Sequence, residues 1–125
     1  MDGYSVKIVA SSIELSAKEK IMAKDTSDAI SIDEATQTSP LEIDFNFYVV
    51  LDIHNEKSDN KDYQKIVVFD RSGQKYVTGS KSFLEALTNI VNDMYEAGED
   101  EFGIRCIRKD SKNYKGKQFI TCSVV

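Results

Sequence analysis

The sequence is poor in the residues that most catalytic and metal sites use. It has one histidine, His54, at the start of a charged loop, and two cysteines, Cys106 and Cys122, which form no Cys-x-x-Cys pair. No cluster of cysteine, histidine and carboxylate residues has the spacing of metal ligands, and no glycine-rich turn before a helix suggests a nucleotide site. We therefore predict a protein that is not an enzyme and that holds no metal or cofactor.

The sequence also lacks a long apolar run and a secretory leader. No run approaches the roughly 18 to 20 residues that cross a bilayer, and the two cysteines are typical of a compartment where thiols stay reduced. We expect a soluble, cytoplasmic protein that binds no membrane. Its 125 residues suffice for one domain that buries a core without disulfides or metals.

The net charge of −5 hides an uneven distribution of charge along the chain. Residues 1–56 carry four basic and eleven acidic side chains, and residues 57–82 carry six and three. Residues 83–101 carry no basic and six acidic side chains, and residues 102–125 carry six and one. Either these runs are solvated faces, or the domain is bipolar, with a basic surface built from residues 57–82 and 102–125.

The strongest pattern in the sequence lies at residues 80–98, SKSFLEALTNIVNDMYEAG. Its apolar residues recur at the offsets of one helical face: Phe83, Leu84, Leu87, Ile90, Val91, Met94 and Tyr95. Ser82 and Glu85 fit a capping box, and Gly98 fits the left-handed residue that often follows a helix. We predict an amphipathic helix that covers the open side of a sheet.

Residues 1–40 are interpreted as an N-terminal extension packed on the main domain, residues 41–125. Residues 4–15 have the pattern of a strand with one apolar face, formed by Val6, Ile8 and Ala10. Ser16 and Glu19 fit a second capping box, which opens a short helix. The only large apolar anchors of that helix are Ile21 and Met22.

Residues 42–53 alternate between apolar and mostly polar side chains without interruption, which predicts a long strand with one face in the core. The core face is expected to hold Ile43, Phe45, Phe47, Val49, Leu51 and Ile53. The opposite face is expected to hold Glu42, Asp44, Asn46, Tyr48, Val50 and Asp52.

Four shorter strands complete the predicted sheet. Residues 63–69 and 74–79 are expected to pair as a hairpin around the turn at 70–73, DRSG. Residues 101–109 and 117–125 are expected to form a second hairpin, in which Cys106 lies opposite Cys122 and Ile104 opposite Val124. The two thiols are then either small buried hydrophobic groups or a redox pair.

Three strands, one helix and two strands, in this order, predict a mainly β fold. The order is that of a five-stranded OB-fold barrel (β-β-β-α-β-β), here with one capping helix and the N-terminal extension.

Aromatic rings stand near cations in several segments, a pattern typical of surfaces that stack bases and neutralise phosphates of single strands. The candidate stacking rings are Tyr48, Tyr63, Tyr76, Tyr114 and Phe119. The candidate phosphate ligands are Lys65, Lys75, Arg105, Arg108, Lys109, Lys112, Lys115 and Lys117. Each ring is also a candidate for the core. Tyr76 is expected to face outward beside Lys75 if its neighbour Val77 enters the core.

The segment FDRSGQKYVTGSKSF and the later segment SKNYKGKQFITCSVV resemble the single-stranded DNA-binding proteins of phages of Gram-positive bacteria and related mobile elements, including small protein-primed phages. The matching features, in order, are Phe69, Gly73, Tyr76, Ser80-Lys81-Ser82, Lys115-Gly116-Lys117 and Phe119. The resemblance covers residues 41–125. It implies an OB barrel that coats single-stranded DNA during replication, with Tyr76 as a stacking residue.

We therefore expect a largely sequence-independent single-stranded DNA-binding protein of phage or mobile-element replication, acting in the cytoplasm of the host cell. Single-stranded DNA is the expected partner, and replication proteins and further copies of the chain are the protein partners that this class allows. The alternative is a protein-interaction or inhibitor module with the same barrel, whose acidic surface docks on a host or replication protein. Binding to single-stranded oligonucleotides that weakens steeply with salt separates the two.

Overall fold

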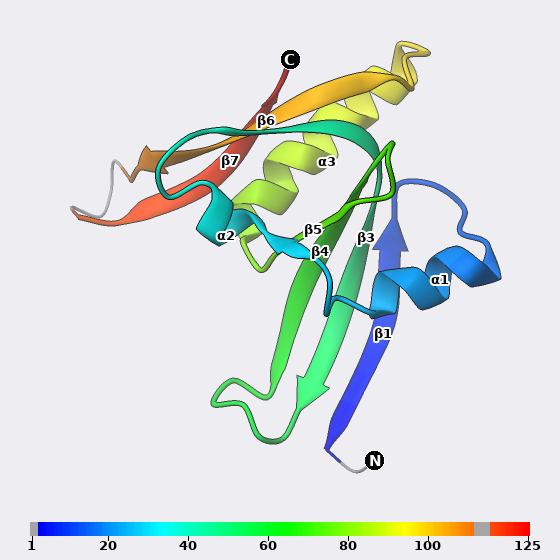
Figure 1. Ribbon diagram of the computed structural model, residues 1–125, viewed down its shortest axis with the longest axis vertical. Helices are drawn as coiled ribbons and strands as arrows, with labels where there is room; N and C mark the ends of the chain where they lie inside the picture. The colour runs from blue at the N-terminus through cyan, green and yellow to red at the C-terminus, as the bar shows by residue number, and fades with distance from the viewer. Residues whose placement is uncertain (1–2, 112–115) are drawn as a thin grey trace.

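The computed structural model describes residues 3–111 and 116–125, which form a mainly β protein with a strongly curled, open sheet (Figure 1). In chain order its elements are β1 (Tyr4–Ser11), α1 (Ala17–Lys24), β2 (Ile30–Ser31), α2 (Ile32–Ala35), β3 (Leu41–Asn55), β4 (Asp62–Asp70), β5 (Lys75–Thr78), α3 (Lys81–Glu96), β6 (Phe102–Asp110) and β7 (Gln118–Val124). No helix in this part of the chain is long and apolar enough to cross a membrane.

β3 is the central strand of the sheet. One of its edges pairs antiparallel with β4, and the other pairs with β6 near the start of β3 and with β1 near its end. The strand order is β2-β5-β4-β3-β6-β7, with β1 beside β3. Between the described parts of β5 and β7 there is no ladder, so the sheet curls without closing. The sheet has seven strands, whereas the prediction counted five barrel strands and one in the extension. The additional strand is β2, which runs parallel to β5.

The short helix α2 connects the two sides of this opening. Ile32 is fully buried, and the side-chain Oδ1 of Asp33 accepts a 2.6 Å hydrogen bond from the hydroxyl of Thr78 in β5. The backbone carbonyl of Asp33 accepts a second hydrogen bond, also 2.6 Å, from Nη2 of Arg108 in β6. α2 therefore links β5 to β6 on the side where the sheet is open.

β3 changes its facing direction at a bulge. Phe45 pairs with Asp70 but Phe47 pairs with Phe69, so β3 has one more residue than β4 between these two pairs. An extra residue reverses which side of the sheet the following side chains face, because side chains alternate along a strand. The prediction that residues 43, 45, 47, 49, 51 and 53 share one face is therefore wrong. Residues 43 and 45 face one side, and residues 47, 49, 51 and 53 face the other.

The inner core lies on the side of the sheet that α3 covers. Phe45 stacks on Phe102, with ring centroids 5.0 Å apart, and Phe83 and Leu87 of α3 are fully buried beside them. The other buried members are Ile32, Ile43, Tyr48, Val50, Ile66, Val68, Val91, Ile104, Cys106, Ile120 and Cys122. The packing of α3 on this side confirms the prediction that residues 80–98 supply an amphipathic helix that covers the sheet.

The outer core lies on the opposite side of the sheet, under the N-terminal segment. Phe47 and Phe69 stack there with centroids 4.4 Å apart and an angle of 13° between the rings. The other buried members are Ala23, Val49, Leu51, Ile53 and Val67. Partly buried side chains from residues 1–40 pack against them: Val6, Ile8, Ile13 and Leu15. Both sides of β3 and β4 are therefore covered, and the division of the chain at residue 40 stays an interpretation of the sequence.

The helix ends agree with the sequence at α1 and differ at the start of α3. Ser16 and Glu19 form the predicted reciprocal capping box. α3 begins two residues earlier than predicted, since its N-cap is Ser80, whose hydroxyl accepts a 3.2 Å hydrogen bond from the backbone N–H of Phe83. Ser82 instead donates a 2.8 Å hydrogen bond to the carbonyl of Ile120 in β7. Gly98 follows the helix at φ +80°, as predicted.

The predicted register of the β6–β7 hairpin is confirmed. Cys106 pairs with Cys122, and Ile104 pairs with Val124. Both thiols are free and buried, and burial raises the pKa of each to about 12. Because the thiolate is the reactive form of cysteine, these surroundings favour small buried hydrophobic groups over a redox pair.

Leu87→Asp tests the inner core. The substitution places an unpaired carboxylate at a position that is 0% exposed. The cost of such a charge is comparable to the whole stability of a domain, about 5–15 kcal/mol, so we expect the cooperative thermal transition to be lost. Circular dichroism measures it. Asn89→Asp is the matched control, because Asn89 is exposed on the same helix. A parent-like melt of Leu87→Asp would contradict the placement of α3.

Candidate nucleic-acid interface

The outward side of the β6–β7 hairpin brings together three of the predicted binding residues. Lys109 lies directly opposite Phe119, and Arg105 lies four residues earlier on the same side of β6. Lys109 and Arg105 are exposed, and the side chain of Phe119, a predicted stacking ring, is 37% exposed. We call these three residues the hairpin face. Lys117 is also exposed at the start of β7.

The two arginines of the hairpin have different surroundings. Arg105 donates from Nε and Nη2 to one carboxylate oxygen of Glu42, at 3.0 and 2.6 Å, and stays exposed. Arg108 faces the other side of β6, where it is half-buried and bound to the carbonyl of Asp33. Its Nε is buried and has no hydrogen-bond partner among the described residues. Arg108 therefore links β6 to α2, and its role as a phosphate ligand stays a prediction.

Three further predicted residues lie on the outer-core side of β4 and β5. Tyr63 and Lys65 are half-buried near the start of β4. Lys75 lies opposite Phe69 and is only 5% exposed, because its Nζ reaches the carbonyls of Met22 and Asp25 and the carboxylate of Asp28. The predicted exposure of Lys75 is wrong.

Two predicted stacking rings belong to the inner core. Tyr48 is 7% exposed, because the bulge turns it away from the polar side where the sequence pattern placed it. Tyr76 is half-buried against the same core, on the opposite side of β5 from Lys75. Burial raises the pKa of Tyr76, and the nearby Asp70 carboxylate raises it further. Tyr76 and Val77 do face opposite sides, as predicted, but both sides are covered.

Three predicted residues lie outside the described part of the chain. They are Lys112, Tyr114 and Lys115, in the tip between β6 and β7.

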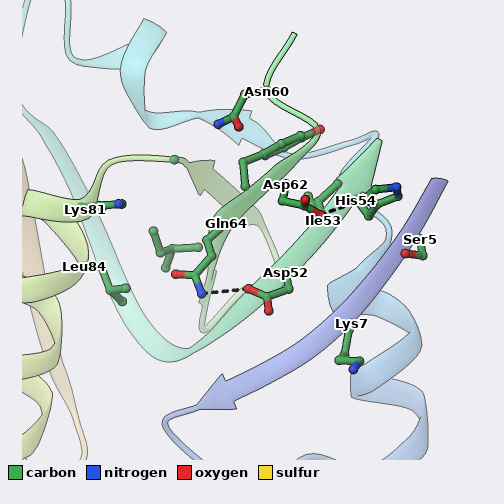
Figure 2. A pocket seen from close by; sticks show the side chains of 13 residues that line it. Ser5, Lys7, Asp52, Ile53, His54, Asn60, Asp62, Gln64, Lys81 and Leu84 are labelled. Atoms are coloured by element: carbon green, nitrogen blue, oxygen red, sulfur yellow. Dashed lines mark hydrogen bonds and ion pairs between the residues drawn. The ribbon is translucent and has the colours of Figure 1, made fainter. Parts of the chain in front are cut away.

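A polar groove, which the sequence did not reveal, lies on the inner side of the sheet near the ends of β3 and β4. Its volume is about 630 Å³. Figure 2 shows Lys81, at the start of α3, and Lys7, from β1, on opposite sides of it. Between them, the amide of Gln64 donates a 2.8 Å hydrogen bond to Asp52. The only signal for it in the sequence is a run of polar residues at alternate positions: Asp52 and His54 on β3, Asp62 and Gln64 on β4.

His54 lies at one end of this groove between two carboxylates. Its Nδ1 is 2.7 Å from Oδ1 of Asp62, and its Nε2 contacts a carboxylate oxygen of Glu56. Glu56 also pairs with Lys61, with 3.3 Å between Oε1 and Nζ. The hydrogen bonds with Asp62 and then Glu56 raise the pKa of His54 above its ordinary 6.5. Within the described residues, no group of three or more histidine, cysteine and acidic side chains is placed to hold a metal ion.

Comparisons of the chain with protein-family models, with curated proteins and with solved structures find no match. The case for a function therefore rests on the sequence and on the geometry of these surfaces. Of the hairpin face and the polar groove, it is the hairpin face that places an exposed aromatic ring directly opposite an exposed cation.

Protonation of His54 is expected to stabilise the fold. A group whose pKa is raised by folding contributes fully below its unfolded pKa, near 6.5, and loses that contribution as pH rises through the folded-state pKa. The melting temperature should therefore fall as pH rises from about 6 to about 8. In His54→Gln the fall should be smaller, since this is the only histidine in the chain. Equal falls in both proteins would show that the carboxylates do not hold a charged His54.

Proposed function

We propose that this protein binds single-stranded DNA, largely without regard to sequence, through an OB-fold barrel, and coats it during phage or mobile-element replication. The strand order supports the fold assignment. β3, β4 and β5 pair in succession, α3 follows, and the β6–β7 hairpin returns to the free edge of β3. An OB-fold is a five-stranded, partly open barrel, and this sheet is open between β7 and the short strand β2, which lies beside β5.

The hairpin face is the observation that carries the binding proposal. Phe119 presents a ring on which a base can stack, and Lys109, directly across the ladder, can neutralise the adjoining phosphate. Among the described residues no ion pair includes Lys109 or Lys117. Their charges are therefore available to a polyanion, unlike that of Lys75.

Salt dependence tests the binding itself. Each phosphate that the protein neutralises releases counterions, so the logarithm of affinity for a single-stranded oligonucleotide should fall linearly with the logarithm of salt concentration, by about 0.7 per phosphate. Fluorescence anisotropy with single-stranded DNA, double-stranded DNA and RNA of equal length measures this. We expect the single-stranded DNA to bind most tightly. A flat response to salt would contradict the phosphate contacts.

Phe119→Ala tests the stacking ring. Losing one base–aromatic stack costs roughly 1–3 kcal/mol, which is about 5- to 150-fold in affinity. Phe119→Tyr should bind like the parent, because it keeps the ring. Tyr4→Ala is the matched control, since Tyr4 is 47% exposed on β1, away from the hairpin. Parent-like binding by Phe119→Ala would remove the hairpin face from the interface.

The alternative function is a protein-interaction or inhibitor module. The exposed side of α3 favours it, because Glu85, Asp93 and Glu96 are exposed there and the helix has no basic residue after Lys81. Such a module would dock this acidic surface on a basic surface of a replication or host protein. Absence of binding to every oligonucleotide, in a folded protein, would favour this function over DNA binding.

A further inference from the structure

The outer side of β4 and β5 carries rings and cations that the N-terminal segment covers. Phe69 stacks on Phe47 and lies opposite Lys75. Tyr63 and Lys65 continue the same side of β4 and are half-buried. Rings interleaved with lysines are what a surface for single strands requires.

The Lys75 end of this surface is closed by α1 with the turn that follows it, residues 16–29, which we call the α1 segment. Its only fully buried residue is Ala23. Ile21 and Met22, the expected apolar anchors, are 72% and 36% exposed, so that expectation is wrong. A methyl group buries far less apolar area than a leucine or isoleucine side chain. Apolar packing therefore holds the α1 segment weakly.

Polar contacts with Lys75 supply much of the remaining attachment. Its Nζ donates to the carbonyl of Met22 at 3.0 Å and to the carbonyl of Asp25, and it lies 2.8 Å from Oδ1 of Asp28. The two carbonyls belong to the last turn and the C-cap of α1, where the helix dipole favours a cation. These are three oxygen acceptors around one ammonium group, and phosphate oxygens could replace them.

We propose that the α1 segment is a removable cover over a second strand-binding surface, and that single-stranded DNA displaces it. A phosphate takes the place of Asp28 and the carbonyls on Lys75, and Phe69 becomes available to a base. This inference rests on the proposed function. Closure of the cover lowers the apparent affinity for DNA by the fraction of molecules that are open, so loosening the cover tightens binding.

Asp28→Asn tests the cover. It removes the ion pair with Lys75, and the side chain of Asp28 is itself exposed, so the fold should persist, as a thermal melt would verify. We expect binding to single-stranded DNA to tighten about 2- to 5-fold. Asp59→Asn is the matched control, because it removes the same charge from an exposed position in the β3–β4 loop. Equal affinities of the two variants would overturn the proposal.

Hydrogen exchange supplies an independent readout. With single-stranded DNA bound, the backbone amides of α1, including that of Lys20, should exchange faster than in the free protein, while those of β4 should not. Slower or unchanged exchange in α1 would overturn the proposal that the α1 segment is displaced. The hairpin face would remain the binding surface if Phe119→Ala still weakens binding. No DNA binding by the parent protein would overturn both proposals.

Discussion

The one-residue bulge in β3 is the constraint on which the rest of the structure depends. Before it, the odd-numbered residues Ile43 and Phe45 face α3, and after it the odd-numbered residues from Phe47 to Ile53 face the opposite side. One strand therefore contributes to two cores. A sheet with apolar residues on both sides must be covered on both sides, since exposed apolar area of this extent is unfavourable.

The second cover explains why residues 1–40 contribute to the sheet itself. β1 pairs along the end of β3, and the backbone N–H of Ser12 donates to the carbonyl of Tyr48 at 3.0 Å while the hydroxyl of Ser12 accepts from the N–H of Tyr48 at 2.9 Å. The bulge in β3 also places Tyr48 in the inner core. Lys75, which in an uncovered sheet would point into solvent, instead binds the end of α1. The bulge thus accounts for the burial of Tyr48, and the cover on the outer side accounts for the burial of Lys75.

Local patterns in the sequence were sufficient for features that depend on neighbouring residues. The Ser16–Glu19 box, the amphipathic face of α3, and the pairing of Cys106 with Cys122 were predictable because each follows from spacing within one element or hairpin. The bulge was not, since every odd-numbered residue from 43 to 53 is apolar, as in a strand without a bulge. The apolar run 47–51, FYVVL, indicates burial on both sides of the strand but does not locate the extra residue. Nor could spacing distinguish Ser80 from Ser82 as the N-cap, because their different partners, Phe83 and Ile120, lie in different elements. The sequence predicted which residues could form the hairpin face. Which of them are exposed on one side depended on the pairing of β6 with β7.

An acidic protein can bind a polyanion when its cations are local to the contact. Charges farther apart than about 8 Å are largely screened at physiological ionic strength, so the net charge of −5 matters less than the charges near the strand. The described residues of the β6–β7 hairpin, 102–111 and 116–125, carry four cations and one carboxylate. On the outer side of β5, by contrast, Lys75 is already neutralised by Asp28. In the binding mode that we propose, access sets the order of events: the exposed hairpin face would meet the strand first, and the covered surface would join only when phosphates compete successfully for Lys75.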